Sequence, residues 1–227
     1  MKLDTYNRHL TRFLTENDER FPKIDQLPCL DNDSEDHGEY CPVYLHFCGW
    51  AARKLAQTTP QRHADFGGLT YFTAIASAIC PIDFYDIRSI RISLPGVTTG
   101  SADLTKLPFP DGSIKSLSCM HVMEHIGLGR YGDTLDVKGD LKAASELKRV
   151  LAPGGQALIV LPVGQPKIYF NAHRIYSYDQ VLEMFSGLRL KEFTLFDPPQ
   201  YIENAKPERV KGIAEGAGCF WFIKENV

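Results

Sequence analysis

The sequence has 227 residues, which allows one large domain or a domain with an appendage. Its 25 Lys and Arg residues against 28 Asp and Glu residues give a formal net charge of −3, so net charge does not attract the chain to nucleic acid or to an anionic membrane. With 44% hydrophobic and 23% charged residues, the composition excludes disordered, collagen-like and membrane classes and indicates a globular protein.

The start of the chain and its cysteines bear on the cellular compartment. The first residues lack the apolar core of a signal peptide, and no stretch approaches the ~18 apolar residues of a membrane helix. We therefore expect a cytoplasmic protein whose six cysteines stay reduced. A loose cluster of possible zinc ligands matches no ligand pair of a zinc site, which disfavours zinc there. It consists of Cys29, His37, Cys41, His46 and Cys48.

Residues 1–60 lack strand-like runs, and we predict that they form a helical extension or lid. A helix is expected over residues 40–55, and it should end before Pro60, because a proline disfavours helix in the residue before it. The second predicted unit, residues 61–227, contains the apolar runs that are typical of strands.

Short apolar runs alternate with helical stretches in residues 61–227, which predicts a doubly wound, mostly parallel α/β sheet. Strands are expected at residues 63–66, 81–87, 97–99, 114–121 and 156–161, and helices at residues 70–80, 136–151 and 177–186. Two further strands, at residues 190–196 and 219–224, follow one another without a clear helix, which favours an antiparallel end to the sheet. Sheets of this kind bind ligands at the carboxyl ends of their strands.

Three strand ends carry residues that suit a nucleoside ligand. Gly67 and Gly68 follow Asp65 and allow close backbone approach to a ligand. Asp86 lies 18 residues after Gly68, where a carboxylate can accept both ribose hydroxyls. Asp103 follows the third strand, and its carboxylate can accept from the amino group of adenine.

Two longer segments resemble the class I S-adenosylmethionine-dependent methyltransferases, in particular the group known as type 11. Residues 102–126, ADLTKLPFPDGSIKSLSCMHVMEHI, resemble the adenine-contacting loop, the fourth strand and the turn after it. Residues 141–162, LKAASELKRVLAPGGQALIVLP, resemble the helix, the Pro-Gly-Gly turn and the fifth strand. The resemblance covers residues 62–224 and implies a seven-stranded Rossmann-like sheet with S-adenosylmethionine as cofactor. A nicotinamide dinucleotide is the weaker alternative, because no complete G-x-G-x-x-G follows the first strand.

The resemblance implies a role for each matching position. It places Asp65, Gly67 and Gly68 at the methionine end of the cofactor, Asp86 at the ribose, Asp103 and Leu104 at the adenine, and Met120 and His121 near the reacting methyl group.

The chain departs from the family at two glycine positions, which are Leu69 and Tyr71 here. We expect their side chains to crowd the usual cofactor path. This departure keeps open a second hypothesis, in which the protein is a non-catalytic binding or scaffold module that has lost the cofactor.

His121, Glu124 and His125 form an H-x-x-E-H run, which on a helix is a zinc metallohydrolase signature. Here the run begins at the end of a predicted strand, which disfavours that geometry. Some ubiquinone-pathway O-methyltransferases have a similar run that is associated with a divalent metal, so a metal stays an alternative to a metal-free site.

Residues 164–178 follow the fifth strand, where the substrate is expected to lie. Asn171, Arg174 and Tyr176 are the candidate substrate-binding residues. His173 or His121 is the candidate general base, because an imidazole titrates near neutral pH. The balanced charge favours a small-molecule acceptor over nucleic acid, and we predict methyl transfer to one of its oxygen or nitrogen atoms.

Overall fold

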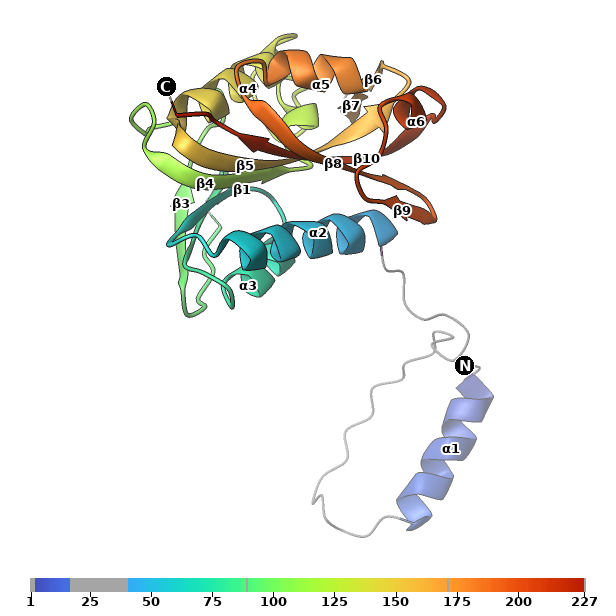
Figure 1. Cartoon of the computed structure of the whole chain (residues 1–227). Coiled ribbons are helices and arrows are strands. Elements are labelled where there is room, and N and C mark those ends of the chain that lie inside the picture. The colour runs from blue at the N-terminus through green and yellow to red at the C-terminus, as the bar shows by residue number, and fades with distance from the viewer. Residues whose placement is uncertain (1–2, 17–40, 89, 171, 227) are drawn as a thin grey trace. The chain divides into compact units, whose positions relative to one another are not determined.

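A computed structural model describes residues 3–16, 41–88, 90–170 and 172–226 (Figure 1). The chain divides into two compact units, Met1–Cys41 and Pro42–Val227. The first unit contains helix α1 (Leu3–Glu16). The loose cluster of His and Cys residues, at which zinc was disfavoured, lies partly outside the described residues, because Cys29 and His37 fall in residues 17–40.

The division at residue 41 differs from the boundary that we expected at residue 60. Helix α2 (Pro42–Thr58) belongs to the second unit, because its apolar face is buried in the same core cluster as residues of the sheet. Phe47, Trp50 and Leu55 are fully buried there.

The second unit is built on an eight-stranded sheet, counted over the described residues. Its order is β3-β2-β1-β4-β5-β10-β8-β9. The strands are β1 (His63–Phe66), β2 (Ile82–Asp86), β3 (Val97–Ser101), β4 (Ile114–Met120), β5 (Leu151–Gly164), β8 (Arg189–Asp197), β9 (Gln200–Ile202) and β10 (Glu215–Ile223). In sheet order, β3, β2, β1, β4 and β5 run parallel to one another. Strand β10 pairs antiparallel with both β5 and β8, and β9 pairs antiparallel with β8. The predicted mixed, mostly parallel methyltransferase-like sheet is confirmed.

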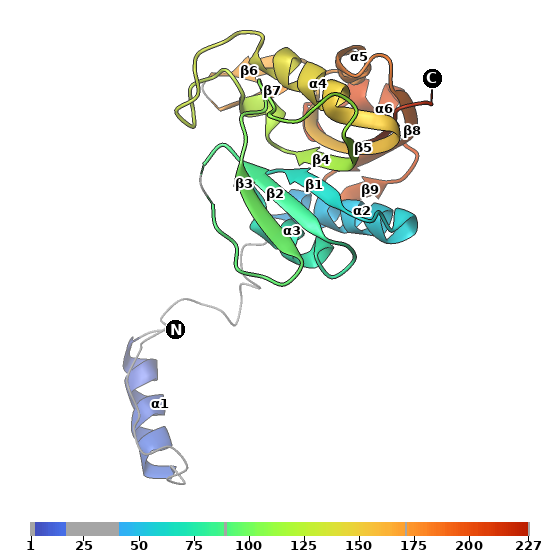
Figure 2. The same ribbon diagram turned by 90° about the vertical axis from the view of Figure 1, so that its left-hand side faces the viewer.

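Helices cover both faces of the sheet. Helices α2 and α3 (Thr70–Ala76) lie on one face, and α4 (Gly139–Val150) and α5 (Tyr178–Met184) lie on the other (Figures 1 and 2). The short helix α6 (Glu208–Lys211) packs into the same core cluster as α4 and α5.

Strand β5 shows why a buried parallel strand reads as a continuous apolar run. Leu158 and Val160 belong to the core cluster under α2 and α3, whereas Ile159 and Leu161 belong to the cluster under α4 and α5. All four side chains are fully buried, because successive side chains point to opposite faces and both faces are covered.

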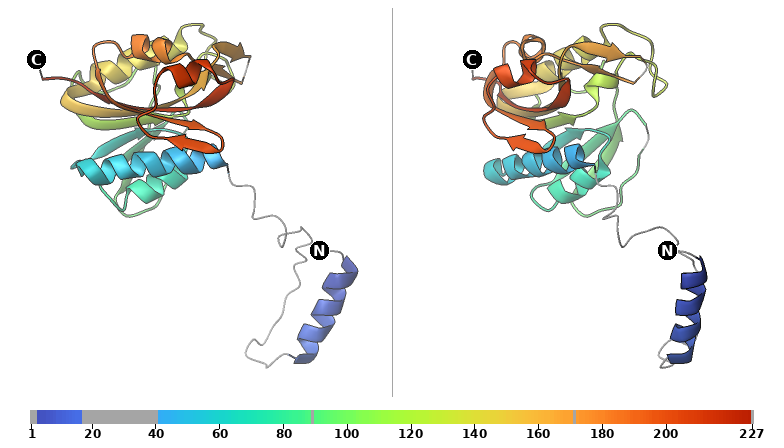
Figure 3. Two further views of the ribbon diagram at one scale, coloured as in Figure 1. Left: turned by 45° about the vertical axis from the view of Figure 1, so that its right-hand side comes forward. Right: turned by 90° about the vertical axis from the view of Figure 1, so that its right-hand side faces the viewer.

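The antiparallel strands β8 to β10 complete one side of the sheet (Figure 3). Strand β10 lies between β5 and β8, and the short β9 adds an edge strand beyond the seven that we expected. A separate hairpin of β6 (Lys167–Tyr169) and β7 (His173–Ile175) follows β5. A helix with the length and apolarity to span a bilayer is absent from the described part of the chain.

Strands β1 and β4 are neighbours at the centre of the sheet, yet the chain leaves them in opposite directions. It runs from β1 outward to β2 and β3, and from β4 to β5 on the other side. Such a reversal opens a crevice at the carboxyl ends of the strands, which is where this fold class binds ligands.

Candidate functional site

A cavity of about 690 Å³ lies at this crevice, and residues from the ends of four parallel strands line it. Its size falls within the range of sites for small organic ligands. Six of the residues expected to bind cofactor or to take part in catalysis are in its lining: Gly67, Gly68, Asp86, Asp103, Leu104 and His121. The tertiary structure therefore brings together residues that are spread over 55 positions of sequence.

The Gly67–Gly68 turn connects β1 to α3 and forms one wall of the cavity. A Cβ atom on Gly67 would lie 3.2 Å from Oδ1 of Asp65, so the turn runs close to that carboxylate. Asp65 itself is 1% exposed and lies beneath the turn. Its carboxylate accepts hydrogen bonds from the hydroxyls of Ser118 at 2.6 Å and Thr73 at 3.1 Å. Burial raises the pKa of Asp65 to about 6, although both hydroxyl donors oppose the shift.

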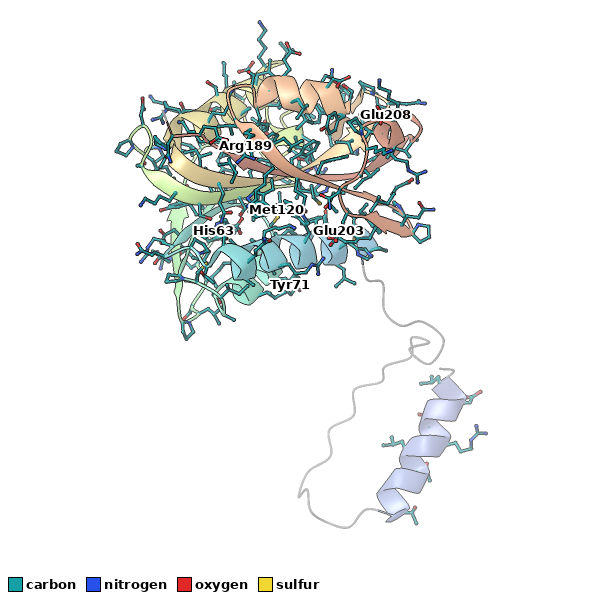
Figure 4. All side chains as sticks on the ribbon, viewed as in Figure 1. His63, Tyr71, Met120, Arg189, Glu203 and Glu208 are labelled. Atoms are coloured by element: carbon teal, nitrogen blue, oxygen red, sulfur yellow. The ribbon has the colours of Figure 1, made fainter. Side chains whose placement is uncertain are left out.

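Leu69 and Tyr71 point away from the cavity. Neither is among the described residues that line it, so the crowding that we expected is not seen. Tyr71 is 82% exposed on α3, and Figure 4 places it at the surface of the molecule. Leu69 packs against the core cluster that α2 and α3 share.

We expect the double variant Leu69→Gly, Tyr71→Gly to change adenosyl-ligand affinity by less than about threefold, because neither side chain faces the cavity. Calorimetry with S-adenosylhomocysteine measures this. The Leu69 change removes apolar burial, so thermal unfolding of the same samples separates a loss of stability from a loss of affinity. A tenfold or larger gain in affinity would show that these side chains do obstruct the site.

Asp86 ends β2 and lines the cavity, and it is already paired. Its Oδ1 accepts from the backbone N–H of Arg88 at 2.7 Å and from Nε of Arg88 at 2.8 Å, and its Oδ2 accepts from the guanidinium at 2.7 Å. The hydrogen bond to Asp86 raises the pKa of Arg88. The Arg88 side chain is 52% exposed, so this ion pair is worth only about 1 kcal/mol or less.

The third strand end supplies polar and apolar surface next to one another. The Asp103 carboxylate accepts from the backbone N–H of Thr105 at 2.8 Å and from its hydroxyl at 2.7 Å, which holds the loop after β3. Leu104 is 8% exposed and joins the core, while the half-exposed Ile87 lies elsewhere in the cavity lining. Leu104 and Ile87 give the cavity the apolar surface on which a planar base can rest.

His121 follows β4 in a strained backbone conformation, with φ of +52°. Its Nδ1 lies 2.8 Å from Oε1 of Glu124, which is 1% exposed. Since a carboxylate only accepts, this contact places the proton of a neutral His121 on Nδ1 and leaves Nε2 as the acceptor. That Nε2 is buried and has no hydrogen-bond partner among the described residues. The arrangement matches that of a general base oriented by a carboxylate.

The H-x-x-E-H run does not lie on an α-helix. After His121 the chain bends into a short 3₁₀ turn (Met123–His125). Nδ1 of His125 contacts the carbonyl oxygen of Ala172 at 2.6 Å, and its Nε2 lies 3.7 Å from Glu124. Within the ranges that the structure describes, no three His, Cys, Asp or Glu side chains are arranged to hold a metal ion.

A loop after β4 forms a further wall of the cavity that we did not predict. It contains Gly127, Gly129 and Gly132, all with positive φ, and the Asp133 carboxylate accepts from the backbone N–H groups of Gly127, Gly129 and Tyr131. Burial opposes the shift, but these donors lower the pKa of Asp133. The sequence signal was present, because residues 127–132 have G-x-G-x-x-G spacing, although after the fourth strand.

The remaining predicted site residues lie elsewhere. Met120 is buried in the core between the sheet and α2 (Figure 4). Nε2 of His173 contacts Glu215 at 3.1 Å, and its ring lies 6.4 Å from that of His125. His173 is absent from the described lining of the cavity, and Asn171 lies outside the described residues.

Arg174 and Tyr176 line a different cavity, of about 680 Å³, next to α4 and α5. Arg174 is 5% exposed and donates to the carbonyl oxygens of Glu124 and Ile126. The hydroxyl of Tyr176 donates to Asp140 at 3.0 Å, and burial raises its pKa. Arg174 therefore stabilises the turn that contains Glu124, and it is not in the described lining of the 690 Å³ cavity.

Comparisons with known proteins agree on the fold. The YcgJ protein of Bacillus subtilis is 16% identical and aligns over 81% of this chain and 100% of its own, with a TM-score of 0.57. A geranyl diphosphate methyltransferase, solved with GPP and sinefungin, is 12% identical and aligns over 78% of this chain and 77% of its own, with a TM-score of 0.56. The chain therefore has the class I S-adenosylmethionine-dependent methyltransferase fold.

Two matches to known proteins were also found at the level of sequence. A family model described as a Caenorhabditis protein of unknown function, DUF268, matches residues 112–196. The demethylmenaquinone methyltransferase of Thermus thermophilus is 32% identical over 120 residues, which are 52% of this chain and 49% of that protein. The matching part thus spans about half the length of this curated relative. The sequence and fold comparisons together show a chain that is similar to methyltransferases.

Proposed function

We propose that the protein transfers a methyl group from S-adenosylmethionine to an oxygen or nitrogen atom of a small molecule. The observation that carries the proposal is the 690 Å³ cavity at the strand ends, lined by Gly67, Gly68, Asp86, Leu104 and His121. Glycines for close approach, an acid for the ribose and an apolar surface for the base meet there in one place.

The residues of this chain fit the cofactor. Asp86 would accept the ribose hydroxyls, Asp103 and Leu104 would hold the adenine, and the Gly67–Gly68 turn would admit the methionine end. The bound cofactor would supply an electrophilic methyl group on a sulfonium, which leaves the protein to align the nucleophile and to remove its proton.

His121 is the proton acceptor that we propose, in place of His173. Glu124 orients its ring through Nδ1, and the unpartnered Nε2 is the basic atom. Nε2 is enclosed, since the rings of Phe47 and Tyr44 lie 5.0 Å and 6.0 Å from that of His121. A nucleophile therefore has to reach a buried nitrogen atom.

A small organic acceptor agrees with the balanced charge of the chain and with the substrates in the names of its similar proteins. Those names specify demethylmenaquinone in one case and geranyl diphosphate in the other. We propose a small-molecule acceptor on this basis.

A non-catalytic binding module is the second candidate. The observation that favours it is the Arg88–Asp86 pair, which occupies both oxygens of the acid that the ribose would need. In that case the cavity would take another ligand or none.

Titration calorimetry with S-adenosylmethionine and S-adenosylhomocysteine distinguishes the two candidates. Methyl transfer predicts that both bind with a Kd of about 50 µM or tighter. NADP⁺ and NAD⁺ serve as comparison ligands, because an arginine beside the ribose acid could accept a phosphate. Binding of neither adenosyl ligand at millimolar concentration would contradict the methyltransferase and favour the module.

A further inference from the structure

Six buried polar side chains form one continuous hydrogen-bonded chain across the centre of the sheet. They come from β10, β5, β4 and β1, and none is more than 7% exposed. In order they are Trp221, Gln156, Ser116, His63, Ser118 and Asp65. The last member lies directly beneath the Gly67–Gly68 turn of the cavity.

The direction of the first link is set by chemistry. Nε1 of Trp221 lies 3.0 Å from Oε1 of Gln156, and an indole can only donate. The amide oxygen of Gln156 must therefore face the indole, so its NH₂ group donates to Ser116 at 3.0 Å and to Thr58 at 2.8 Å. Ser116 thus accepts from Gln156, which leaves its own proton for the next link.

The direction at the other end is set independently. A carboxylate only accepts, so Ser118 donates to Asp65 at 2.6 Å and has to accept from Nε2 of His63 at 2.9 Å. Nδ1 of His63 then accepts from Ser116 at 2.7 Å. Burial lowers the pKa of His63 to about 3, so the ring is neutral and carries a single N–H. Both ends of the chain assign that N–H to Nε2.

We propose that this chain locks His63 in the Nε2–H tautomer and makes it a positioning residue that stabilises the Asp65 carboxylate beneath the cavity. Every donor in the chain points toward Asp65, and successive bonds of the same direction strengthen one another. His63 acts through Ser118 and does not itself reach the ligand.

The charge of Asp65 has no countercharge of its own. Among the described residues no Lys or Arg forms an ion pair with it, and the titratable groups that it influences are the thiols of Cys48 on α2 and Cys119 on β4. Burial raises the pKa of both thiols, to about 11 for Cys48, which keeps them neutral. An isolated carboxylate beneath the Gly67–Gly68 turn favours a cationic ligand group there, such as an ammonium or a sulfonium. This step rests on the proposed function.

Nitrogen NMR of the full chain, labelled in its histidine rings, tests the tautomer without any ligand. The chain has seven histidines, so His63→Gln identifies the His63 signals by their loss. We expect a protonated Nε2 and an unprotonated Nδ1 between pH 7 and 8, where Asp65 is ionised. A protonated Nδ1, or an imidazolium at pH 7, would overturn the proposal.

Trp221→Phe tests in the same experiment whether the Asp65 end is sufficient. Without the indole donor the Gln156 amide can turn over, but Ser118 still donates to Asp65, so we expect His63 to keep the Nε2–H tautomer. A mixture of both tautomers in this variant would overturn the assignment made from the Asp65 end. Unfolding curves of the variant establish that it is folded.

The ligand step is tested by the ratio of affinities for S-adenosylmethionine, a sulfonium, and S-adenosylhomocysteine, a neutral thioether. Ser118→Ala removes the donor that ends the chain at Asp65. We expect it to lower the preference for the sulfonium about tenfold. Ser118→Thr restores a hydroxyl and should recover this preference. The exposed Ser113→Ala is the control, because the Ser113 hydroxyl donates to the carbonyl oxygen of Pro110 and is not a member of the hydrogen-bonded chain. An unchanged ratio in Ser118→Ala would overturn the role of Asp65. Binding of neither ligand to the parent would contradict the proposed function, while the NMR result decides the tautomer by itself.

Discussion

Replacing Asp86 with alanine is expected to weaken adenosyl-ligand binding about 100-fold. The carboxylate lies at the end of β2 in the cavity and is the acceptor that we assign to both ribose hydroxyls. Hydrogen bonds to a charged group contribute about 1.5–3 kcal/mol each, and about 3 kcal/mol in total corresponds to two orders of magnitude in Kd. Calorimetry with S-adenosylhomocysteine measures the loss.

Two variants show whether the loss comes from the ribose contact. Asp83→Ala on the same strand removes an acid that pairs with Arg62 at 2.6 Å, outside the described lining of the cavity, and should leave affinity unchanged. Arg88→Gln frees Asp86 from its ion pair and should tighten binding by up to about fivefold, because a pair of this exposure is worth about 1 kcal/mol. Weaker binding in Arg88→Gln would instead indicate that Arg88 holds an anionic part of the ligand.

Gly127→Ala is the substitution for which we expect the largest loss of stability in the loop after β4. A Cβ atom there would lie 2.0 Å from the carbonyl oxygen of Asp136, and the backbone has φ of +80°. The loop has to move or to break the hydrogen bond from Asp136 N–H to the Gly127 carbonyl. We expect a cost of about 3 kcal/mol, from left-handed strain and overpacking together.

Gly132→Ala is the matched control for this prediction. Gly132 has the same φ of +80°, but a Cβ atom on it would meet no described atom within 4 Å. It should cost only the strain, about 1–2 kcal/mol. Urea unfolding compares the two variants, and limited proteolysis detects a loop that detaches while the rest stays folded. Equal effects of the two substitutions would show that the clash with Asp136 is relieved at little cost.

Much of the sheet could be predicted because its signals are local. The run of apolar residues at 156–161 indicated a strand buried on both faces, and β5 places Leu158 and Ile159 in opposite core clusters. Glycines and acids after the strands indicated where a ligand would lie, since parallel strands end at one edge. Gly67, Gly68 and Asp86 do meet at one cavity.

The predictions about individual side chains were less complete, because they depend on contacts that sequence spacing does not show. Leu69 and Tyr71 were expected to crowd the cavity, but Leu69 packs against the core before α3 and Tyr71 is exposed on α3. Arg174 was expected near the substrate, and it is instead buried against the carbonyl oxygens that precede the loop at residue 127. A side chain that lines a cavity and one that packs elsewhere can therefore occur at the same kind of position in the sequence.

The sequence alone indicated the central strands and helices in chain order and the strand ends at which a ligand site is expected, but not α1, β6, β7, β9 or α6. Periodicity and turn residues act within a few positions, so a single strand or helix shows them. Only the tertiary structure decided which groups are paired and which way each hydrogen bond runs. Ser118 and His63 are 55 positions apart, and Gln156 and Trp221 are 65 apart, yet their contacts place one proton on a histidine ring beneath the cavity. Tautomer and charge follow from the donors that surround a group in space, and the fold brings those donors together.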